Sequence, residues 1–87
     1  MKLYGAVVKE QGVTFAIIVV KKYILDLRAK AQETARSFSR FFPGIPIILM
    51  AQDERGIPTY LGRRDIVRFL ANIDHQRIPW KEYTVSL

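Results

Sequence analysis

The chain of 87 residues contains no cysteine. This absence excludes disulfides, thiolate chemistry and zinc sites built on cysteine, but it constrains the compartment only weakly. His75 is the only histidine, so a histidine-rich metal site is excluded as well. From these residues we expect neither a metal ion nor any other cofactor.

Long apolar runs are also missing. The longest, Val13 to Val20, contains a threonine and is closed by Lys21 and Lys22, whereas a membrane span needs roughly 20 apolar residues. Near the N-terminus, Lys9 and Glu10 interrupt the apolar pattern too early for a signal peptide. The sequence therefore predicts a cytoplasmic protein with no membrane partner.

Acidic residues are few, with 8 Asp and Glu against 14 Lys and Arg, which gives a formal charge of +6 and a pI near 10.0. A basic domain attracts phosphates, nucleic acid or acidic membrane surfaces through its summed field. Solubility alone is an equally good explanation of such a charge. The apolar share of 49% and the charged share of 25% predict one soluble globular domain over residues 1–87.

The first half of the chain predicts a hairpin followed by a helix. Leu3 to Val8 and Val13 to Val20 read as strands, and the second is apolar nearly throughout, as in a strand covered on both faces or on one well-buried face. A helix is expected over Asp26 to Phe41, with Asp26 as its N-cap. Its apolar stripe comprises Leu27, Ala31, Ala35, Phe38 and Phe42.

The second half repeats this order and adds a strand. Ile45 to Ala51 and Ile57 to Leu61 read as a hairpin across the turn "QDERG". A helix follows from about Arg63 to Ile73. In the final segment, "WKEYTVSL", alternation places Tyr83, Val85 and Leu87 on one face of a last strand, expected at an edge.

The element order is thus β-β-α-β-β-α-β. The two most apolar strands are joined by a helix, which predicts that they are parallel with their hairpin partners outside them. The predicted fold is α+β: a two-layer sandwich in which two helices pack on one face of a four- to five-stranded mixed sheet.

Arginines gather on both predicted helices. They are Arg28, Arg36 and Arg40 on the first helix and Arg63, Arg64 and Arg68 on the second. Such stripes suit a nucleic-acid backbone, although every surface helix needs a polar face. Gly62 precedes the second helix, whose free N–H groups favour an anion, while Asp65 in its first turn would compete.

Other candidates are weaker. Asp53 and Glu54 are adjacent acids, best explained as part of a solvated turn closed by Gly56. Trp80 and Tyr83 near the C-terminus are either packing residues or an interface beside an open strand edge. No nucleophile, base and orienting group can be assembled, so we predict no catalytic residues.

The segment Ile45 to Ile73 resembles the C-terminal half of thioredoxin-like proteins. It has an Ile-Pro pair opening a strand, a glycine hairpin, and Gly62 before a helix ending "RFLANI". The resemblance implies a cis peptide bond at Pro46. The family's Cys-x-x-Cys is missing, so its thiol redox chemistry is excluded.

The sequence thus favours a small basic non-enzymatic binding module that contacts a polyanion, namely nucleic-acid phosphate, through the six arginines. The alternative is a protein–protein interaction or self-assembling module that pairs through its C-terminal edge strand. A hollow gathering Asp53, Tyr60 and His75 would instead favour an enzyme.

Overall fold

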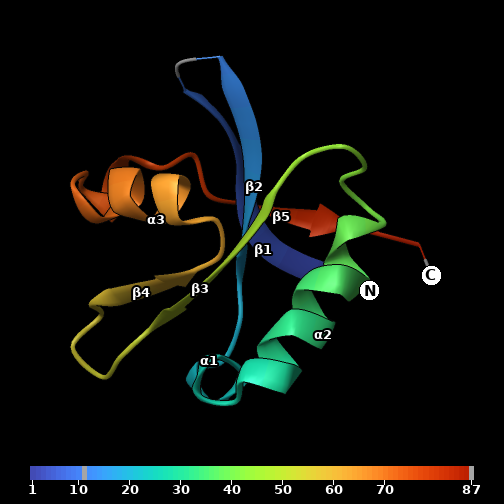
Figure 1. The fold of residues 1–87 in the computed structure, drawn as a ribbon, viewed down its shortest axis with the longest axis horizontal. Coiled ribbons are helices and arrows are strands. Elements are labelled where there is room, and N and C mark those ends of the chain that lie inside the picture. The colour runs from blue at the N-terminus through green and yellow to red at the C-terminus, as the bar shows by residue number, and fades with distance from the viewer. Residues whose placement is uncertain (11, 87) are drawn as a thin grey trace.

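A five-stranded mixed sheet forms the centre of the molecule (Figure 1). The structure, a computed structural model, describes residues 1–10 and 12–86. The strand order is β4-β3-β2-β1-β5. The strands are β1 (Lys2–Glu10), β2 (Val13–Val19), β3 (Ile47–Gln52), β4 (Pro58–Leu61) and β5 (Lys81–Thr84). The helices are α1 (Lys22–Asp26), α2 (Arg28–Ser39), α3 (Arg64–Ala71) and the 3-10 turn η1 (His75–Arg77).

The strand pairing follows the predicted scheme. β2 and β3 are parallel, with Ala16 opposite Ile47, and each carries its antiparallel hairpin partner on its outer side. Gly12 closes the first hairpin at a φ of 81°, a left-handed conformation that favours glycine. β5 pairs antiparallel with β1 and forms one edge of the sheet. The α+β class, the element order and the mixed sheet are therefore confirmed.

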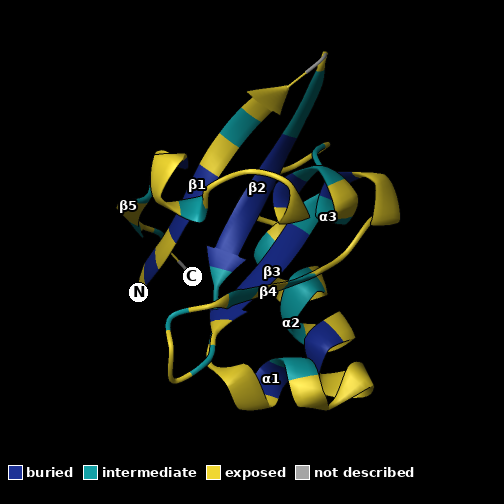
Figure 2. Cartoon of the chain, turned by 90° about the vertical axis from the view of Figure 1, so that its left-hand side faces the viewer, coloured by how far each residue is buried: buried dark blue, intermediate teal, exposed yellow. Residues whose placement is uncertain are grey.

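The helices lie on opposite faces of the sheet, which corrects the expectation that both pack on one face (Figure 1). Ile17 of β2 packs with Ile66 and Leu70 of α3, whereas the next residue, Ile18, packs with Ala31 of α2. Successive side chains of a strand point to opposite faces, so a strand that is apolar throughout must be covered on both. Burial accordingly concentrates in the central strands β2 and β3 (Figure 2).

The first predicted helix is divided into two. "KYILD" forms the single-turn helix α1, and α2 begins after Leu27, whose extended backbone separates the two. Asp26 therefore ends α1 and does not cap α2. Leu27, expected in the apolar stripe, is 59% exposed because it occupies this junction. In the second half, α3 ends at Ala71, so Ile73 follows the helix and is partly exposed.

Two further expectations concern the peptide bond at Pro46 and the C-terminal strand. No peptide bond in residues 1–10 and 12–86 is cis, so the cis Pro46 implied by the thioredoxin-like resemblance is wrong. Tyr83 and Val85 share a face of the sheet, as predicted, while Leu87 lies outside the described residues. Among the described helices, none is long and apolar enough to cross a membrane.

Candidate polyanion site at the β4 edge

Helices α2 and α3 cover opposite faces of the sheet, yet side chains from both lie around the same edge strand, β4. Gly62 links β4 to α3 at this point. Its φ is 155°, and a Cβ there would meet the Ile48 side chain and lie 3.1 Å from the Ile47 carbonyl oxygen. Only glycine fits without displacement, so the bare backbone of Gly62 runs close to β3.

Two adjoining hollows occupy this edge, and they share Arg28, Leu61 and Gly62. We call them together the β4 groove. The hollow towards α3 measures about 440 Å³ and is also lined by Tyr60, Arg64, Val67 and Arg68. The hollow towards α2 measures about 510 Å³ and is also lined by Leu25, Asp26 and Gln32.

The β4 groove carries an excess of positive charge. Arg28, Arg64 and Arg68 are all exposed. Within the part of the chain that the structure describes, the ion pairs are Lys2–Glu82 and Arg63–Asp65, so none of these three guanidinium groups is paired with a carboxylate there. Asp26 at the α2 end is the one carboxylate lining the groove among the described residues.

Arg63 is the predicted arginine that has a carboxylate partner. Its Nε and Nη2 donate to the two carboxylate oxygens of Asp65 at 2.7 and 2.8 Å. This bidentate contact, with help from the Ile66 N–H, lowers the pKa of Asp65 to about 2, and Asp65 in turn raises the pKa of Arg63. Within the predicted anion site at "GRRD", the Arg63 guanidinium is thus already paired with a carboxylate of the chain itself.

Arg36 and Arg40 lie further along α2 and do not line the groove. With a rise of about 1.5 Å per residue, they stand about 12 and 18 Å along the helix axis from Arg28. The structure therefore brings together three of the six predicted arginines, leaves two outside, and pairs one with Asp65. Tyr60 was not predicted in this site. Its hydroxyl is buried, has no hydrogen-bond partner among the described residues, and burial raises its pKa.

Trp80 and Tyr83, predicted as an interface, lie on opposite faces of the sheet. Trp80 Nε1 donates to the His75 carbonyl at 2.8 Å, and its ring stacks near Tyr4. Tyr83 packs edge-on against Phe42, with their ring centroids 5.8 Å apart. These two aromatic side chains therefore do not form one surface.

The acidic turn is built as predicted. Asp53 Oδ1 accepts hydrogen bonds from the N–H groups of Arg55 and Ile57 at 2.8 and 2.9 Å, and Gly56 has a φ of 80°. Asp53, Tyr60 and His75 line three different hollows, so they form no common site. Among the described residues, no group of three or more His, Asp and Glu side chains is placed to hold a metal ion.

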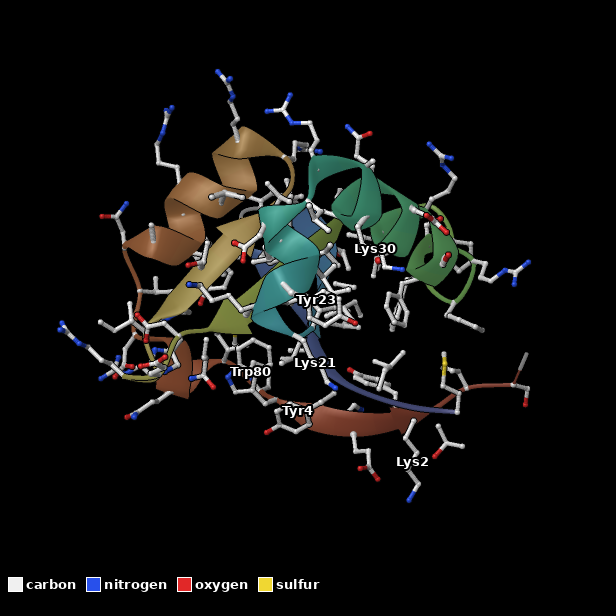
Figure 3. The ribbon with its side chains drawn as sticks, turned by 90° about the horizontal axis from the view of Figure 1, so that it is seen from below. Lys2, Tyr4, Lys21, Tyr23, Lys30 and Trp80 are labelled. Carbon is white, nitrogen blue, oxygen red and sulfur yellow. The ribbon has the colours of Figure 1, made fainter. Side chains whose placement is uncertain are left out.

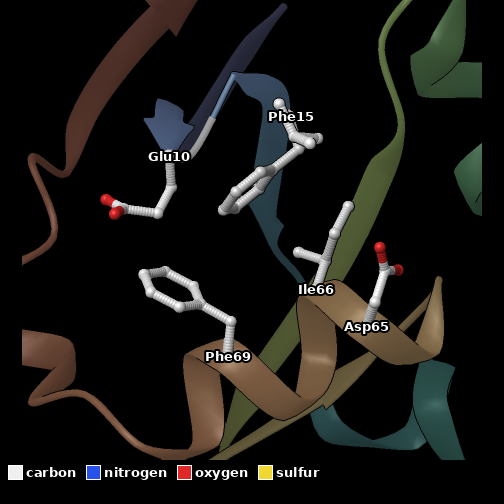
Figure 4. A pocket seen from close by; sticks show the side chains of 6 residues that line it. Glu10, Phe15, Asp65, Ile66 and Phe69 are labelled. Carbon is white, nitrogen blue, oxygen red and sulfur yellow. The ribbon is translucent and has the colours of Figure 1, made fainter.

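A smaller hollow of about 150 Å³ separates the β1–β2 hairpin from α3 (Figure 4). Phe15, Ile66 and Phe69 give it an apolar lining, and its two carboxylates, Glu10 and Asp65, come from the hairpin and the helix respectively. In Figure 4 these two carboxylates point away from each other. Paired acid–base chemistry needs carboxyl groups that converge on one point, and this hollow does not supply them.

Comparisons with known proteins do not indicate a family or a function for this chain. A scan against protein-family models, a search of curated proteins and a search of solved structures each find no significant match to this chain.

Proposed function

We propose that the protein is a small, basic, non-enzymatic module that binds a polyanion, namely the phosphates of a nucleic acid, in the β4 groove. One observation supports this most directly. Arg28 of α2 and Arg64 and Arg68 of α3 line a single hollow, although their helices lie on opposite faces of the sheet. The net charge of +6 and the cytoplasmic location expected from the sequence agree with such a partner.

Binding rests on charge-assisted contacts. A guanidinium group donates two parallel hydrogen bonds to a phosphate, and Arg64 and Arg68 are one helical turn apart, so both forks face the groove. Each neutralised phosphate releases condensed counterions, which makes the affinity fall with salt. Arg36 and Arg40 extend the positive charge along α2, where a longer strand would meet them.

The test compares two double variants with the same charge change. Arg64→Ala with Arg68→Ala removes two guanidinium groups from the groove, and Arg36→Ala with Arg40→Ala removes two from outside it. Binding is measured by fluorescence anisotropy of a labelled 8-nucleotide single strand at low salt. We expect the groove pair to weaken binding at least about tenfold, since the loss of even one charged hydrogen bond of about 1.5–3 kcal/mol has this effect, and the outer pair less than about threefold.

Two results would contradict the proposal. Equal losses from both pairs would mean that the strand responds to overall charge and not to the β4 groove. No detectable binding of the unmodified protein at low salt would rule out nucleic acid as the partner.

The second candidate function is self-assembly through β5. β5 is an edge strand, and its outer backbone groups have no strand partner among the described residues. The placement of Trp80 and Tyr83 on opposite faces means that such pairing would rest on backbone hydrogen bonds more than on one aromatic patch. Sedimentation equilibrium at high protein concentration tests this candidate function. If the protein is strictly monomeric under these conditions, self-assembly through β5 is ruled out.

A further inference from the structure

Another hollow, of about 400 Å³, lies on the α3 face of the sheet, away from the β4 groove, and shares no lining residue with it. Two aromatic side chains line it, Tyr4 of β1 and Trp80 before β5. Three polar side chains, Gln52, His75 and Gln76, line it as well, while β2 and β3 contribute apolar side chains. Its volume falls in the range of small-molecule sites in proteins, about 300–1,000 Å³.

The aromatic pair is held in a defined orientation. The rings of Tyr4 and Trp80 are nearly parallel, at 21°, with centroids 6.1 Å apart, and their side chains lie together in Figure 3. The hydrogen bond from Trp80 Nε1 to the His75 carbonyl fixes the indole. Tyr4 remains 50% exposed. The pair therefore offers an accessible ring face on which a third planar ring can stack.

Hydrogen-bonding groups stand beside this ring face. Gln52 Nε2 donates to the Gly56 carbonyl at 3.0 Å and lies 3.5 Å from His75 Nε2, which leaves the Gln52 amide oxygen as an acceptor. Asp74 caps η1 by accepting a hydrogen bond from the backbone N–H of Gln76, so the cap does not use the side-chain amide of Gln76. Amide groups of this kind match the donor and acceptor edges of nucleobases.

Charge distinguishes this hollow from the β4 groove. Its lining contains no Lys, Arg, Asp or Glu, so it suits an uncharged planar ring better than a phosphate. We propose that it binds a nucleobase, stacked on the Tyr4–Trp80 pair and held at its edge by Gln52 and Gln76. The base would belong either to a free nucleoside or to an unpaired nucleotide of a strand. This proposal does not depend on the function of the β4 groove.

Trp80 is the only tryptophan in the chain, so its fluorescence reports on this hollow directly. The experiment titrates the full chain with adenosine, with uridine and with a 10-nucleotide poly(dA) strand. Tyr4→Leu removes the accessible ring, and Tyr23→Leu is the matched control, because Tyr23 on α1 is similarly exposed, at 56%, and lies outside the hollow. Base–aromatic stacking is worth about 1–3 kcal/mol, so we expect Tyr4→Leu to raise the dissociation constant at least about fivefold.

The outcomes distinguish a free nucleoside from an unpaired nucleotide of a strand, and this hollow from the β4 groove. Saturable quenching by a nucleoside identifies a free ligand, and quenching by poly(dA) alone identifies an unpaired base. Saturable quenching should remain when Arg64 and Arg68 are replaced by alanine, since those residues belong to the other site, although a strand that also contacts the β4 groove then needs a higher concentration. The proposal is overturned if no probe quenches Trp80 saturably, if that double variant abolishes the quenching, or if Tyr4→Leu binds as tightly as Tyr23→Leu.

Discussion

At the scale of single residues, Asp65 pairs with one of the two arginines of the "GRRD" segment and leaves the other available to a binding partner. Its two carboxylate oxygens accept hydrogen bonds from Nε and Nη2 of Arg63, and this contact lowers the pKa of Asp65 to about 2 because it favours the charged form. Arg64, the next residue, has no such partner among the described residues and lines the β4 groove. Two adjacent arginines therefore have different roles.

Asp65 gives a prediction about pH. A carboxyl group whose pKa is lower in the folded chain than the usual 3.8 contributes stability above that usual value, and loses the contribution as the pH falls towards 2. We therefore expect Asp65→Asn to be less stable than the unmodified protein at pH 6, with the difference shrinking between pH 4 and pH 2. Urea midpoints across this range measure it.

The control for that comparison is Glu54→Gln, which removes a carboxylate from the exposed hairpin turn. Glu54 is in neither of the ion pairs among the described residues, so this variant removes a carboxylate without removing an arginine partner. A difference between Asp65→Asn and the unmodified protein that stays constant down to pH 2 would contradict the assigned ion pair.

At the scale of elements, the junction between α1 and α2 is a weak point of the fold. Leu27 is the N-cap of α2 in extended conformation, yet it offers no side-chain acceptor to the free N–H groups of the first turn. It is also largely exposed, so little packing depends on it. A residue with a capping hydroxyl should suit this position better than leucine.

We therefore predict that Leu27→Ser stabilises the protein by about 0.5–1 kcal/mol, because serine caps a helix where leucine does not. Thermal unfolding would show this as a rise of a few degrees in the midpoint. Leu27→Ala, which removes the same side chain without adding an acceptor, is the control. Equal midpoints for the serine and alanine variants would contradict the capping explanation.

The strands could be predicted from the sequence, whereas the placement of the helices on the sheet could not. The alternating and apolar runs predicted every strand and the parallel pairing of β2 with β3, because these depend on local periodicity and chain connectivity. The run from Val13 to Val20 already indicated a strand that could be covered on both faces. The choice between one face and two depends on how the helices pack, which no single helix pattern determines.

The candidate site was predictable only in part for the same reason. Arg28, Arg64 and Arg68 were all predicted as binding residues, but their meeting at β4 depends on the two helices lying on opposite faces of the sheet. The hollow beside Tyr4 and Trp80 was missed, because these residues are 76 positions apart in the sequence and meet only through the pairing of β5 with β1.

At the scale of the whole molecule, the sheet lies between α2 on one face and α3 on the other. Two surfaces of different chemistry result on one small domain. The β4 edge presents arginines from both outer layers, and the sheet face beside α3 presents an uncharged aromatic hollow. The net charge of +6 draws an anionic strand to the molecule from any direction, so only the arrangement of the charges can favour one surface. We propose that the three arginines of the β4 groove provide that surface.

The salt dependence of strand binding distinguishes contacts in the β4 groove from a response to the overall charge. For a single strand, the logarithm of the binding constant falls with the logarithm of the salt concentration with a slope of about −0.7 for each phosphate neutralised. Three groove arginines predict a slope of about −2 for an 8-nucleotide strand, and Arg64→Ala with Arg68→Ala should bring it to about −0.7. A slope that is the same in this variant as in the unmodified protein would mean that the groove arginines do not hold the strand.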